Sequence, residues 1–383
     1  MLEVQTQNRP IPDSRAARFL TDLIGRADIQ INGSRPWDIQ IHDPRWFQRV
    51  LSQGSLGLGE SYMDGWWDCE QLDEMFSKGL AAHLEDLLPR NISLVLSVVK
   101  SNLLNRQNKT DSKTVARKHY DLGNGFYRDM LDPRMQYTCA YWKGADTLEQ
   151  AQENKLDLIC RKLSVRPGMK ILELGCGWGG FARFAAERYG CEVTALNISE
   201  QQVAYARANT QGLPVNIQLK DYRDAEGLYD RVVSVGLCEH IGPKNYETFL
   251  KIIHQSLKEE GMALVHTIGG NASVHDLDPW LDKYIFPNAV LPSIRQLSQA
   301  MEKLFVVEDW HNFGVDYDKT LMAWHARFTA HWPRHQNEFD ARFYRMWNYY
   351  LLNCAGSFRA RKNQLWQIVL SKHGVPGGYT SIR

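Results

Sequence analysis

The sequence lacks a strong excess of charge of either sign. Its 383 residues include 45 Lys and Arg against 44 Asp and Glu, for a formal net charge of +1. Proteins that bind nucleic acids usually carry a clear basic excess, so this balance argues against nucleic acid as a partner. The seven cysteines contain no C-x-x-C pair, so neither a zinc ribbon nor a disulfide framework is indicated and no metal site is predicted.

Long apolar segments are also missing. No apolar run approaches the ~18 residues of a membrane span, and the first ten residues lack the apolar core of a signal peptide. We therefore expect a cytoplasmic protein that is able to touch a membrane but does not cross it. The 12 Trp residues fit either buried apolar pockets or contact with a membrane interface.

The length predicts two domains, at ~150 residues per domain. Residues 1–105 read as a small α+β domain with a helix over 16–27, a hairpin over 29–41, a short helix over 44–52 and a glycine-rich loop over 54–59. The adjacent Trp66 and Trp67 fit a packed corner better than an exposed lipid anchor. Residues 106–125 are expected to be a linker.

A basic segment joins the two expected domains. Residues 91–105 show helical spacing with one apolar face, and residues 90–118 hold seven Lys or Arg against the single acidic Asp111. Such a segment is able to bind anionic phospholipid head groups. A solvated linker explains the charge equally well.

Residues 126–383 read as a larger α/β domain. Strand-like apolar runs, among them 170–174 and 215–219, alternate with helical patterns from residue 170 to residue 267. This alternation predicts a mostly parallel, doubly wound sheet with helices on both faces. The region after residue 271 is aromatic and is expected to be mostly helical. Its aromatic stripe over 339–358 fits helix packing better than the lining of a pocket.

A glycine-rich loop follows the first strand of this domain. Glu173 ends the strand, and Gly175, Gly177 and Gly179 lead into a helix. Glycines allow tight turns and close approach to a ligand, but the acidic residue repels phosphate and suits a cation or ribose hydroxyls. The pattern resembles motif I of S-adenosylmethionine (SAM)-dependent methyltransferases more than a dinucleotide site, and the fold is therefore expected to be Rossmann-like.

Further segments narrow the resemblance. They are HYDLGN at 119–124, QYTCAYW at 136–142, GLCEHIG at 236–242, VHTIG at 265–269, WLDKYIFP at 280–287 and EDWHNFGVDY at 308–317. Together with the glycine loop they closely resemble the bacterial cyclopropane-fatty-acyl-phospholipid synthases and the related mycolic acid cyclopropane synthases. The resemblance implies that SAM methylates a cis double bond of a phospholipid acyl chain, and that loss of a methyl proton closes a cyclopropane ring and leaves S-adenosylhomocysteine (SAH).

The same resemblance implies the site residues. A bicarbonate ion is expected to act as the base, with ligands Cys139, Glu239, His266, the backbone N–H of Ile268 and Tyr317. SAM is expected to be bound by Tyr137, Thr138, Gly175, Gly177, Trp178, Asn197, Gln202, Asp221, Leu237 and Cys238. Without the resemblance, Cys139 is more simply a small buried hydrophobe, and His266 and Tyr317 are hydrogen-bonded core residues. Asn197 stands where such enzymes commonly carry a carboxylate for the ribose, so its assignment is the weakest.

The expected partners follow from the substrate. The N-terminal domain and the basic segment are expected to bring the site to the inner face of the membrane as a peripheral protein. An apolar tunnel for the acyl chain is expected among residues 271–366, and the family suggests a homodimer. Two rivals stay open: a relative that lets water trap the carbocation and makes a hydroxylated or methyl-branched lipid, and a non-catalytic lipid-transfer or lipid-sensing protein.

Overall fold

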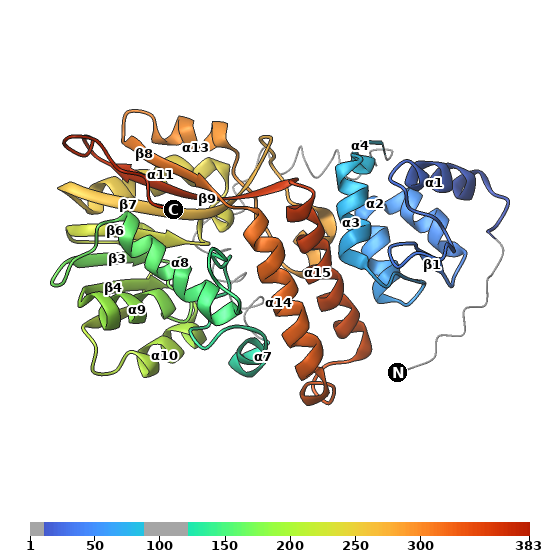
Figure 1. The fold of residues 1–383 in the computed structure, drawn as a ribbon, viewed down its shortest axis with the longest axis horizontal. Helices are drawn as coiled ribbons and strands as arrows, with labels where there is room; N and C mark the ends of the chain where they lie inside the picture. Colours follow the sequence, from blue (N-terminus) through green and yellow to red (C-terminus); the bar gives the residue numbers. More distant parts are fainter. Residues whose placement is uncertain (1–10, 88–121) are drawn as a thin grey trace.

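The computed structural model describes residues 11–87 and 122–383. A small N-terminal part lies at one end and a sheet-based part at the other, with two long helices, α14 and α15, between them (Figure 1). These helices span Val315–His331 and Ala341–Arg359. The basic segment and most of the expected linker lie outside the described residues, so the predictions made for them are not addressed by the fold.

The N-terminal part consists of four helices and a two-stranded sheet. The helices are α1 (Arg15–Gly25), α2 (Arg45–Met63), α3 (Leu72–Ala81) and α4 (Leu84–Leu87), and β1 (Gln40–Ile41) pairs antiparallel with β2 (Trp67–Asp68). The predicted hairpin is wrong, because Ile31 and Ile39 form only an isolated parallel bridge and residues 40–41 pair with the distant β2. The predicted loop over 54–59 is wrong except at Gly54, whose non-helical backbone, with a φ of 58°, makes a kink between two helical segments of α2.

Trp67 confirms the packed-corner interpretation. Its side chain is fully buried, and its indole N–H donates to the Leu58 carbonyl at 3.0 Å and to the Ser61 hydroxyl at 3.1 Å. A buried indole satisfies its polar end in this way and contributes a large apolar area to the core. Trp66 is partly exposed, and the guanidinium groups of Arg45 and Arg49 lie over its ring.

The larger part is built on a seven-stranded sheet in the order β5-β4-β3-β6-β7-β9-β8. The strands are β3 (Lys170–Leu174), β4 (Glu192–Asn197), β5 (Val215–Leu219), β6 (Tyr229–Val235), β7 (Leu257–Gly270), β8 (Val306–Asn312) and β9 (Asn363–Ser371). The first five run parallel, and β9 and β8 are antiparallel additions. The predicted α/β class with a mostly parallel sheet is confirmed, but β8 and β9 lie where helices were expected.

Helices cover both faces of the sheet. The helices α8 (Leu148–Lys162), α9 (Gly180–Tyr189) and α10 (Glu200–Asn209) contribute to one apolar core, whereas α11 (Tyr246–Ser256) and α13 (Ile294–Met301) contribute to another. Two shorter helices, α7 (Gly123–Met130) and α12 (Pro279–Tyr284), complete this part. The doubly wound arrangement leaves the carboxyl ends of the parallel strands open, which is where such sheets bind ligands.

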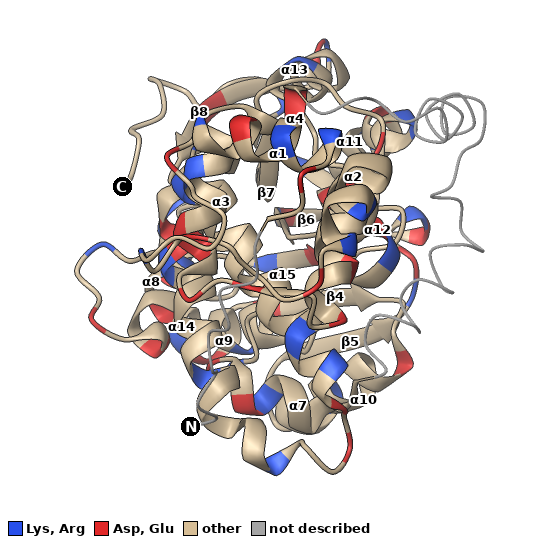
Figure 2. Cartoon of the chain, turned by 90° about the vertical axis from the view of Figure 1, so that its right-hand side faces the viewer, with Lys and Arg blue, Asp and Glu red and all other residues tan. Residues whose placement is uncertain are grey.

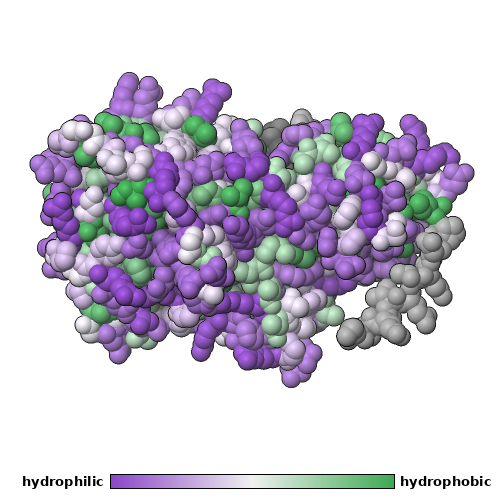
Figure 3. Space-filling model, in the orientation of Figure 1, coloured by the Kyte–Doolittle hydropathy of each residue, from purple (hydrophilic) through white to green (hydrophobic). Residues whose placement is uncertain are grey.

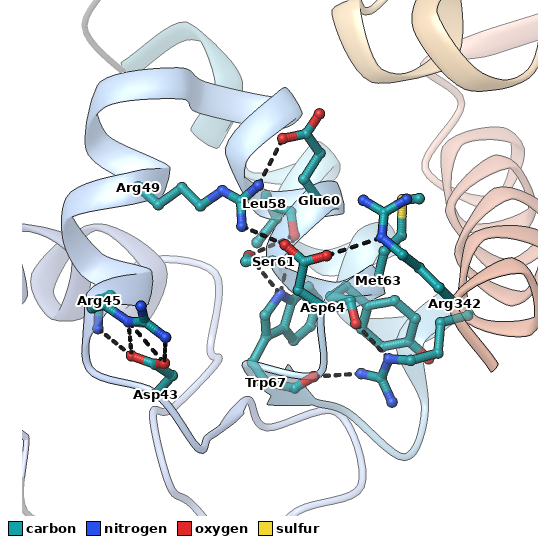
Figure 4. Close-up of polar contacts among 12 residues, drawn as sticks. Asp43, Arg45, Arg49, Leu58, Glu60, Ser61, Met63, Asp64, Trp67 and Arg342 are labelled. Atoms are coloured by element: carbon teal, nitrogen blue, oxygen red, sulfur yellow. Dashed lines mark hydrogen bonds and ion pairs between the residues drawn. The ribbon is translucent and has the colours of Figure 1, made fainter. Parts of the chain in front are cut away.

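The N-terminal part packs on α15 through small residues and ion pairs. A Cβ on Gly356 of α15 would lie 2.5 Å from the backbone oxygen of Asp73 in α3, so only glycine permits this approach. Figure 4 shows Arg49 between Glu60 and Asp64, with Asp64 also bound by Arg342 of α15 at 3.0 Å. The two parts are therefore joined by a specific interface.

The surface mixes charges of both signs. Figure 2 shows Lys and Arg interspersed with Asp and Glu over the elements drawn, and Figure 3 shows a largely hydrophilic face with small, separated apolar groups. Within residues 11–87 and 122–383, every helix is too short or too polar to cross a bilayer.

Candidate active site

One cavity opens at the carboxyl ends of β3, β4, β6 and β7. The strand order reverses between β3 and β6, which is the topological switch point where doubly wound sheets bind their ligands. The cavity has a volume of about 910 Å³, and the glycine loop after β3 forms part of its wall. Gly175 and Gly177 have φ angles of 78° and 52°, in the left-handed region that favours glycine.

Most of the predicted site residues line this cavity. Of the catalytic set these are Glu239, His266, Ile268 and Tyr317; of the cofactor set they are Tyr137, Thr138, Gly175, Gly177, Trp178, Asn197, Gln202, Asp221 and Leu237. The lining also includes Leu80, His83, Glu85 and Asp86 of the N-terminal part and many residues of the 271–366 region. The fold therefore brings together segments that are far apart in the sequence, such as α3 and α15.

The thiols of Cys139 and Cys238 do not line the cavity. Both side chains are fully buried; the Cys139 thiol donates to the Ala140 carbonyl at 3.2 Å, and the Cys238 thiol interacts with Thr267. Burial raises the pKa of each thiol far above its ordinary value, so each stays protonated. The thiols therefore pack as small buried hydrophobes in this structure, and the roles of Cys139 toward the anion and of Cys238 beside the cofactor stay predictions.

Asn197 holds the glycine loop. Its Nδ2 donates to the Gly177 carbonyl at 2.9 Å and to Gln202 Oε1 at 2.9 Å, and its Oδ1 accepts from the Ser199 N–H at 3.1 Å. Both amide hydrogens are thereby used within the protein. The amide therefore fixes the loop and orients Gln202 through its two N–H donors. A carboxylate at the same position has no donor and is unable to make these two bonds.

Asp221 lies at the end of β5 and starts a short 3₁₀ helix over Tyr222–Asp224. Its Oδ1 accepts from the Arg223 N–H at 2.9 Å, and the Arg223 guanidinium lies 3.0 Å from the same oxygen. The carboxylate is buried and lines the cavity at the expected place. Arg223 thus holds the carboxylate through Oδ1 at the wall of the cavity.

Glu239 presents an unsatisfied carboxylate oxygen. It lies in the 3₁₀ helix Cys238–His240 after β6, where Oε1 accepts from the Ile268 N–H at 2.7 Å while the buried Oε2 has no partner. Burial raises the pKa of Glu239 to about 7. The Ile268 amide therefore serves the carboxylate in this structure, whereas a direct bond from it to an anion stays a prediction.

His266 presents an unsatisfied ring nitrogen. The side-chain amide of Gln367 donates to Nδ1 at 3.3 Å, which leaves the proton of the neutral ring on Nε2, and that atom is buried without a partner. Burial lowers the pKa of His266 well below its ordinary value, so the ring is neutral. A neutral donor and the Glu239 acceptor thus face the same cavity, where unpaired buried polar atoms are costly unless a ligand binds them.

Glu173 and Lys155 form a second buried polar group below the glycine loop. Burial raises the pKa of Glu173 to about 8, and its Oε2 is unpartnered and buried. Lys155 of α8 has no exposed surface, and burial lowers its pKa to about 8. Sequence reasoning missed Lys155, because a lysine on a helix is normally solvated; the apolar residues around it, Leu156 and Leu158, give no sign that it faces inward.

We call Glu173, Glu239 and His266 the polar wall, and Phe286, Tyr317, Tyr350 and Phe358 the aromatic wall. Tyr317 stacks on Phe358 with ring centroids 4.5 Å apart, and the Tyr350 hydroxyl bonds that of Tyr137 at 2.8 Å. The stripe over 339–358 packs as predicted, but Tyr350, Cys354 and Phe358 also line the cavity. Pocket lining, the less favoured interpretation, therefore holds for these three residues.

The residues present fit SAM. The cofactor carries two positive groups and one carboxylate, and the polar wall offers it the unpartnered Glu173 carboxyl oxygen below a loop whose glycines allow close approach. Trp178 adds an indole that is held by Asn124 at 2.8 Å, and it packs against Tyr127. The site is therefore able to bind a positively charged group beside an aromatic base such as adenine.

Comparison with known proteins decides the family. The model of a protein family described as "Mycolic acid cyclopropane synthetase" matches residues 107–368 of this chain. The chain belongs to this family. It is 52% identical to the cyclopropane-fatty-acyl-phospholipid synthase of Escherichia coli K12 over 368 residues, which covers 96% of each chain. It is also 32% identical to cyclopropane mycolic acid synthase 3 of Mycobacterium tuberculosis, over 66% of this chain and 95% of that one.

Solved structures agree with the family. The mycolic acid cyclopropane synthase CmaA1, in a complex with SAH and CTAB, is 30% identical and superposes with a TM-score of 0.64, covering 68% of this chain and 98% of its own. Coclaurine N-methyltransferase, bound to SAH, is only 22% identical but has a TM-score of 0.68, so it supports the fold alone. The protein is an enzyme of the SAM-dependent methyltransferase class.

Proposed function

We propose that the enzyme transfers a methylene group from SAM to a cis double bond of a phospholipid acyl chain, giving a cyclopropane ring, SAH and a proton. The similarity to the E. coli synthase extends over 96% of both chains and so includes the N-terminal part. The observation that carries the proposal is the pair of unpartnered atoms, Glu239 Oε2 and His266 Nε2, in one cavity with the glycine loop and the aromatic wall.

The aromatic wall suits the charge that develops on the acyl chain. SAM supplies an electrophilic methyl group, and its addition to an alkene leaves a carbocation that water would convert to an alcohol. Tyr317 and Phe358 stack into a closed surface, and aromatic faces attract a nearby cation. Leu281, Leu291 and Leu365 extend the lining with apolar side chains from the 271–366 region, which is where the acyl chain is expected. These residues exclude water from the reacting carbons.

The polar wall suits bicarbonate, which supplies the base for the final methyl proton. Bicarbonate carries one O–H donor and several acceptor oxygens. His266 Nε2–H would donate to an oxygen, and Glu239 Oε2 would accept the O–H, so the two unpartnered atoms complement the ion. The ionised Glu239 would also raise the basicity of a bound anion, because like charges disfavour each other. Tyr317 lines the same cavity and is proposed as a third ligand.

The membrane role and the homodimer are parts of the same proposal. A phospholipid substrate requires contact with the bilayer, and we assign this contact to the N-terminal part together with the basic segment, at the inner face of the membrane. A homodimer would present two such segments and increase avidity. Light scattering on the purified protein tests the dimer; a monomer mass at micromolar concentration would remove it.

Deuterated SAM tests the reaction. The enzyme is incubated with SAM carrying a CD₃ group and vesicles with cis-unsaturated chains, and the acyl chains are then analysed by mass spectrometry. Ring closure expels one deuterium and retains two, whereas trapping by water retains all three and adds a hydroxyl. Absence of label in the lipid would exclude the enzymatic proposal, and a hydroxylated product would exclude only the cyclopropane assignment.

Vesicle sedimentation tests the basic segment. Charge reversal of Lys109, Lys113, Arg117 and Lys118 should weaken binding to anionic vesicles, because each basic residue near the surface contributes ~1 kcal/mol. A matched control reverses four exposed basic residues of the larger part, Arg166, Lys170, Lys244 and Arg295. Equal binding of the two variants would remove the segment from the proposal.

A further inference from the structure

Lys155 is placed to control one hydrogen bond of the cofactor site. Its Nζ donates to Gln136 Oε1 at 2.6 Å and to Thr138 Oγ1 at 2.8 Å. On the same helix, Gln152 Nε2 donates to the carbonyl oxygens of Gln136 and Thr138, at 3.3 Å and 2.9 Å. Two side chains of α8 therefore hold the 136–138 segment from behind.

The close approach of this segment depends on small residues. A Cβ on Gly180, at the start of α9, would lie 2.2 Å from Gln136 Nε2, and a Cβ on Gly236 would lie 2.7 Å from Thr138 Cγ2. Thr138 is therefore held between Lys155 of α8 and Gly236 at the end of β6, and it forms part of the cavity wall.

The direction of the Thr138 hydroxyl follows from the chemistry of its neighbour. An ammonium group only donates, so Lys155 occupies a lone pair of Oγ1 and the hydroxyl hydrogen must point elsewhere. The carbonyl oxygens nearest in sequence, those of Gln136 and Thr138, already accept from Gln152. Because Thr138 lines the cavity, an acceptor of a bound ligand is able to receive this hydrogen from the cavity side.

We propose that Lys155 is a positioning residue that makes the Thr138 hydroxyl a hydrogen-bond donor toward the carboxylate of SAM. The inference rests on the proposed function only for its cofactor and not for the lipid reaction. The acceptor is assigned to the cofactor because Thr138 lies beside Gly236 and Leu237, which meet the glycine loop: a Cβ on Gly175 would lie 3.2 Å from Leu237 Cβ.

The test measures SAH binding by isothermal titration calorimetry, so it gives an answer whatever the lipid product is. Lys155→Met and Thr138→Val should each weaken SAH binding about 10- to 100-fold, since hydrogen bonds to charged groups contribute that much. Thr138→Ser keeps the hydroxyl and should stay within about threefold of the wild type. The double variant should lose little more than either single one, because both remove the same interaction.

Lys162→Met is the matched control. Lys162 lies on the same helix, is equally buried, and contacts His311 at 3.1 Å and Asp309 at 3.4 Å, away from the cavity lining. Its loss should reduce the melting temperature but leave SAH affinity within about threefold. Should Lys155→Met not fold, Lys155→Gln replaces it; this side chain both donates and accepts, so it no longer forces the hydroxyl outward and affinity should still fall.

Three outcomes overturn the inference. Wild-type SAH affinity in folded Lys155→Met or in Thr138→Val would show that the hydrogen bond does not serve the cofactor. Equal losses in Lys155→Met and Lys162→Met would indicate a general effect of core damage. Unchanged SAH affinity with activity that added bicarbonate restores would assign the Thr138 donor to the anion instead of the cofactor.

Discussion

The polar wall and the aromatic wall enclose one cavity but satisfy their polar atoms differently. In the polar wall, Glu173 Oε2, Glu239 Oε2 and His266 Nε2 are buried without partners. In the aromatic wall, the Tyr350 hydroxyl bonds Tyr137 at 2.8 Å and the rings of Tyr317 and Phe358 stack. In the proposed reaction this contrast would separate two tasks: the unpartnered atoms of the polar wall would bind ligands, whereas the packed rings of the aromatic wall would hold the acyl chain away from water.

The largest effect is expected at the centre of the polar wall. Glu239→Ala should reduce turnover about 1,000-fold, since it removes a charged group at the reacting centre, while SAH affinity stays within about threefold. Labelled methyl transfer and calorimetry measure the two quantities. Glu259→Ala, at an exposed glutamate paired with Lys372 and His373, is the control and should keep full activity. Equal losses of turnover and SAH affinity would make Glu239 a cofactor ligand.

A stability effect is expected in the aromatic wall. Phe358→Ala removes a buried ring that stacks on Tyr317 and should lower the free energy of unfolding by about 3–5 kcal/mol. Denaturant unfolding measures the change. The exposed Phe19 of α1 is the control, and its replacement by Ala should cost less than about 0.5 kcal/mol. Similar values for both would mean that the wall is not rigidly packed.

The pH dependence of stability distinguishes the two walls. The pKa of Glu239 is raised by burial from 4.5 to about 7, so the folded state binds this proton more tightly than the unfolded state. The stabilisation is present below about pH 4.5 and is lost as the pH rises through 7, up to about 3 kcal/mol for a shift of this size.

Glu239→Gln cannot ionise and should therefore be more stable than the wild type at pH 8, with little difference at pH 4.5. Thermal unfolding at the two pH values measures this. Identical pH profiles of the two proteins would show that the Glu239 carboxylate is not held in a dry environment. Glu173, whose pKa is raised to about 8, continues to titrate in both proteins and does not affect the comparison.

The smallest effect is expected at the hydroxyl of Tyr350, in the aromatic wall. Tyr350→Phe deletes the hydroxyl that bonds Tyr137 and should lower SAH affinity no more than about fivefold, since one neutral hydrogen bond contributes ~1 kcal/mol. Calorimetry checks the value. A loss greater than about 50-fold would mean that Tyr350 touches the cofactor and belongs to the polar wall.

The strands of the parallel sheet were largely predictable from the sequence. The strands β3 and β5 begin and end at the predicted residues 170–174 and 215–219. β3 is a buried apolar run, whereas β5 lies at the edge of the sheet and is only partly buried. Gly54, Gly57 and Gly59 suggested a loop, but only Gly54 interrupts the helix, and Gly57 and Gly59 lie in its second segment. A Cβ on Gly59 would lie 2.3 Å from Trp280, a contact that no local pattern reveals.

Part of the site could also be predicted from the sequence, and part could not. Glu239 follows β6, His266 lies near the end of β7, and both belong to recognisable motifs, so their place at one edge of the sheet was predictable. Lys155 was not, because its burial depends on the packing of α8 beneath the 136–138 segment. Cys139 lies in a motif that the resemblance assigns to the anion, yet its thiol is buried and donates to the Ala140 carbonyl, and the residue is not part of the cavity lining.

The sequence by itself determined the alternation of strands and helices, the glycine loop and the identity of the residues at the strand ends, because these depend on local periodicity and on steric limits at glycine. The tertiary structure alone decided which polar atoms are left without partners, which lysine is buried and which rings close the cavity. These properties depend on desolvation and on contacts between residues far apart in the chain, and neither is a function of local sequence.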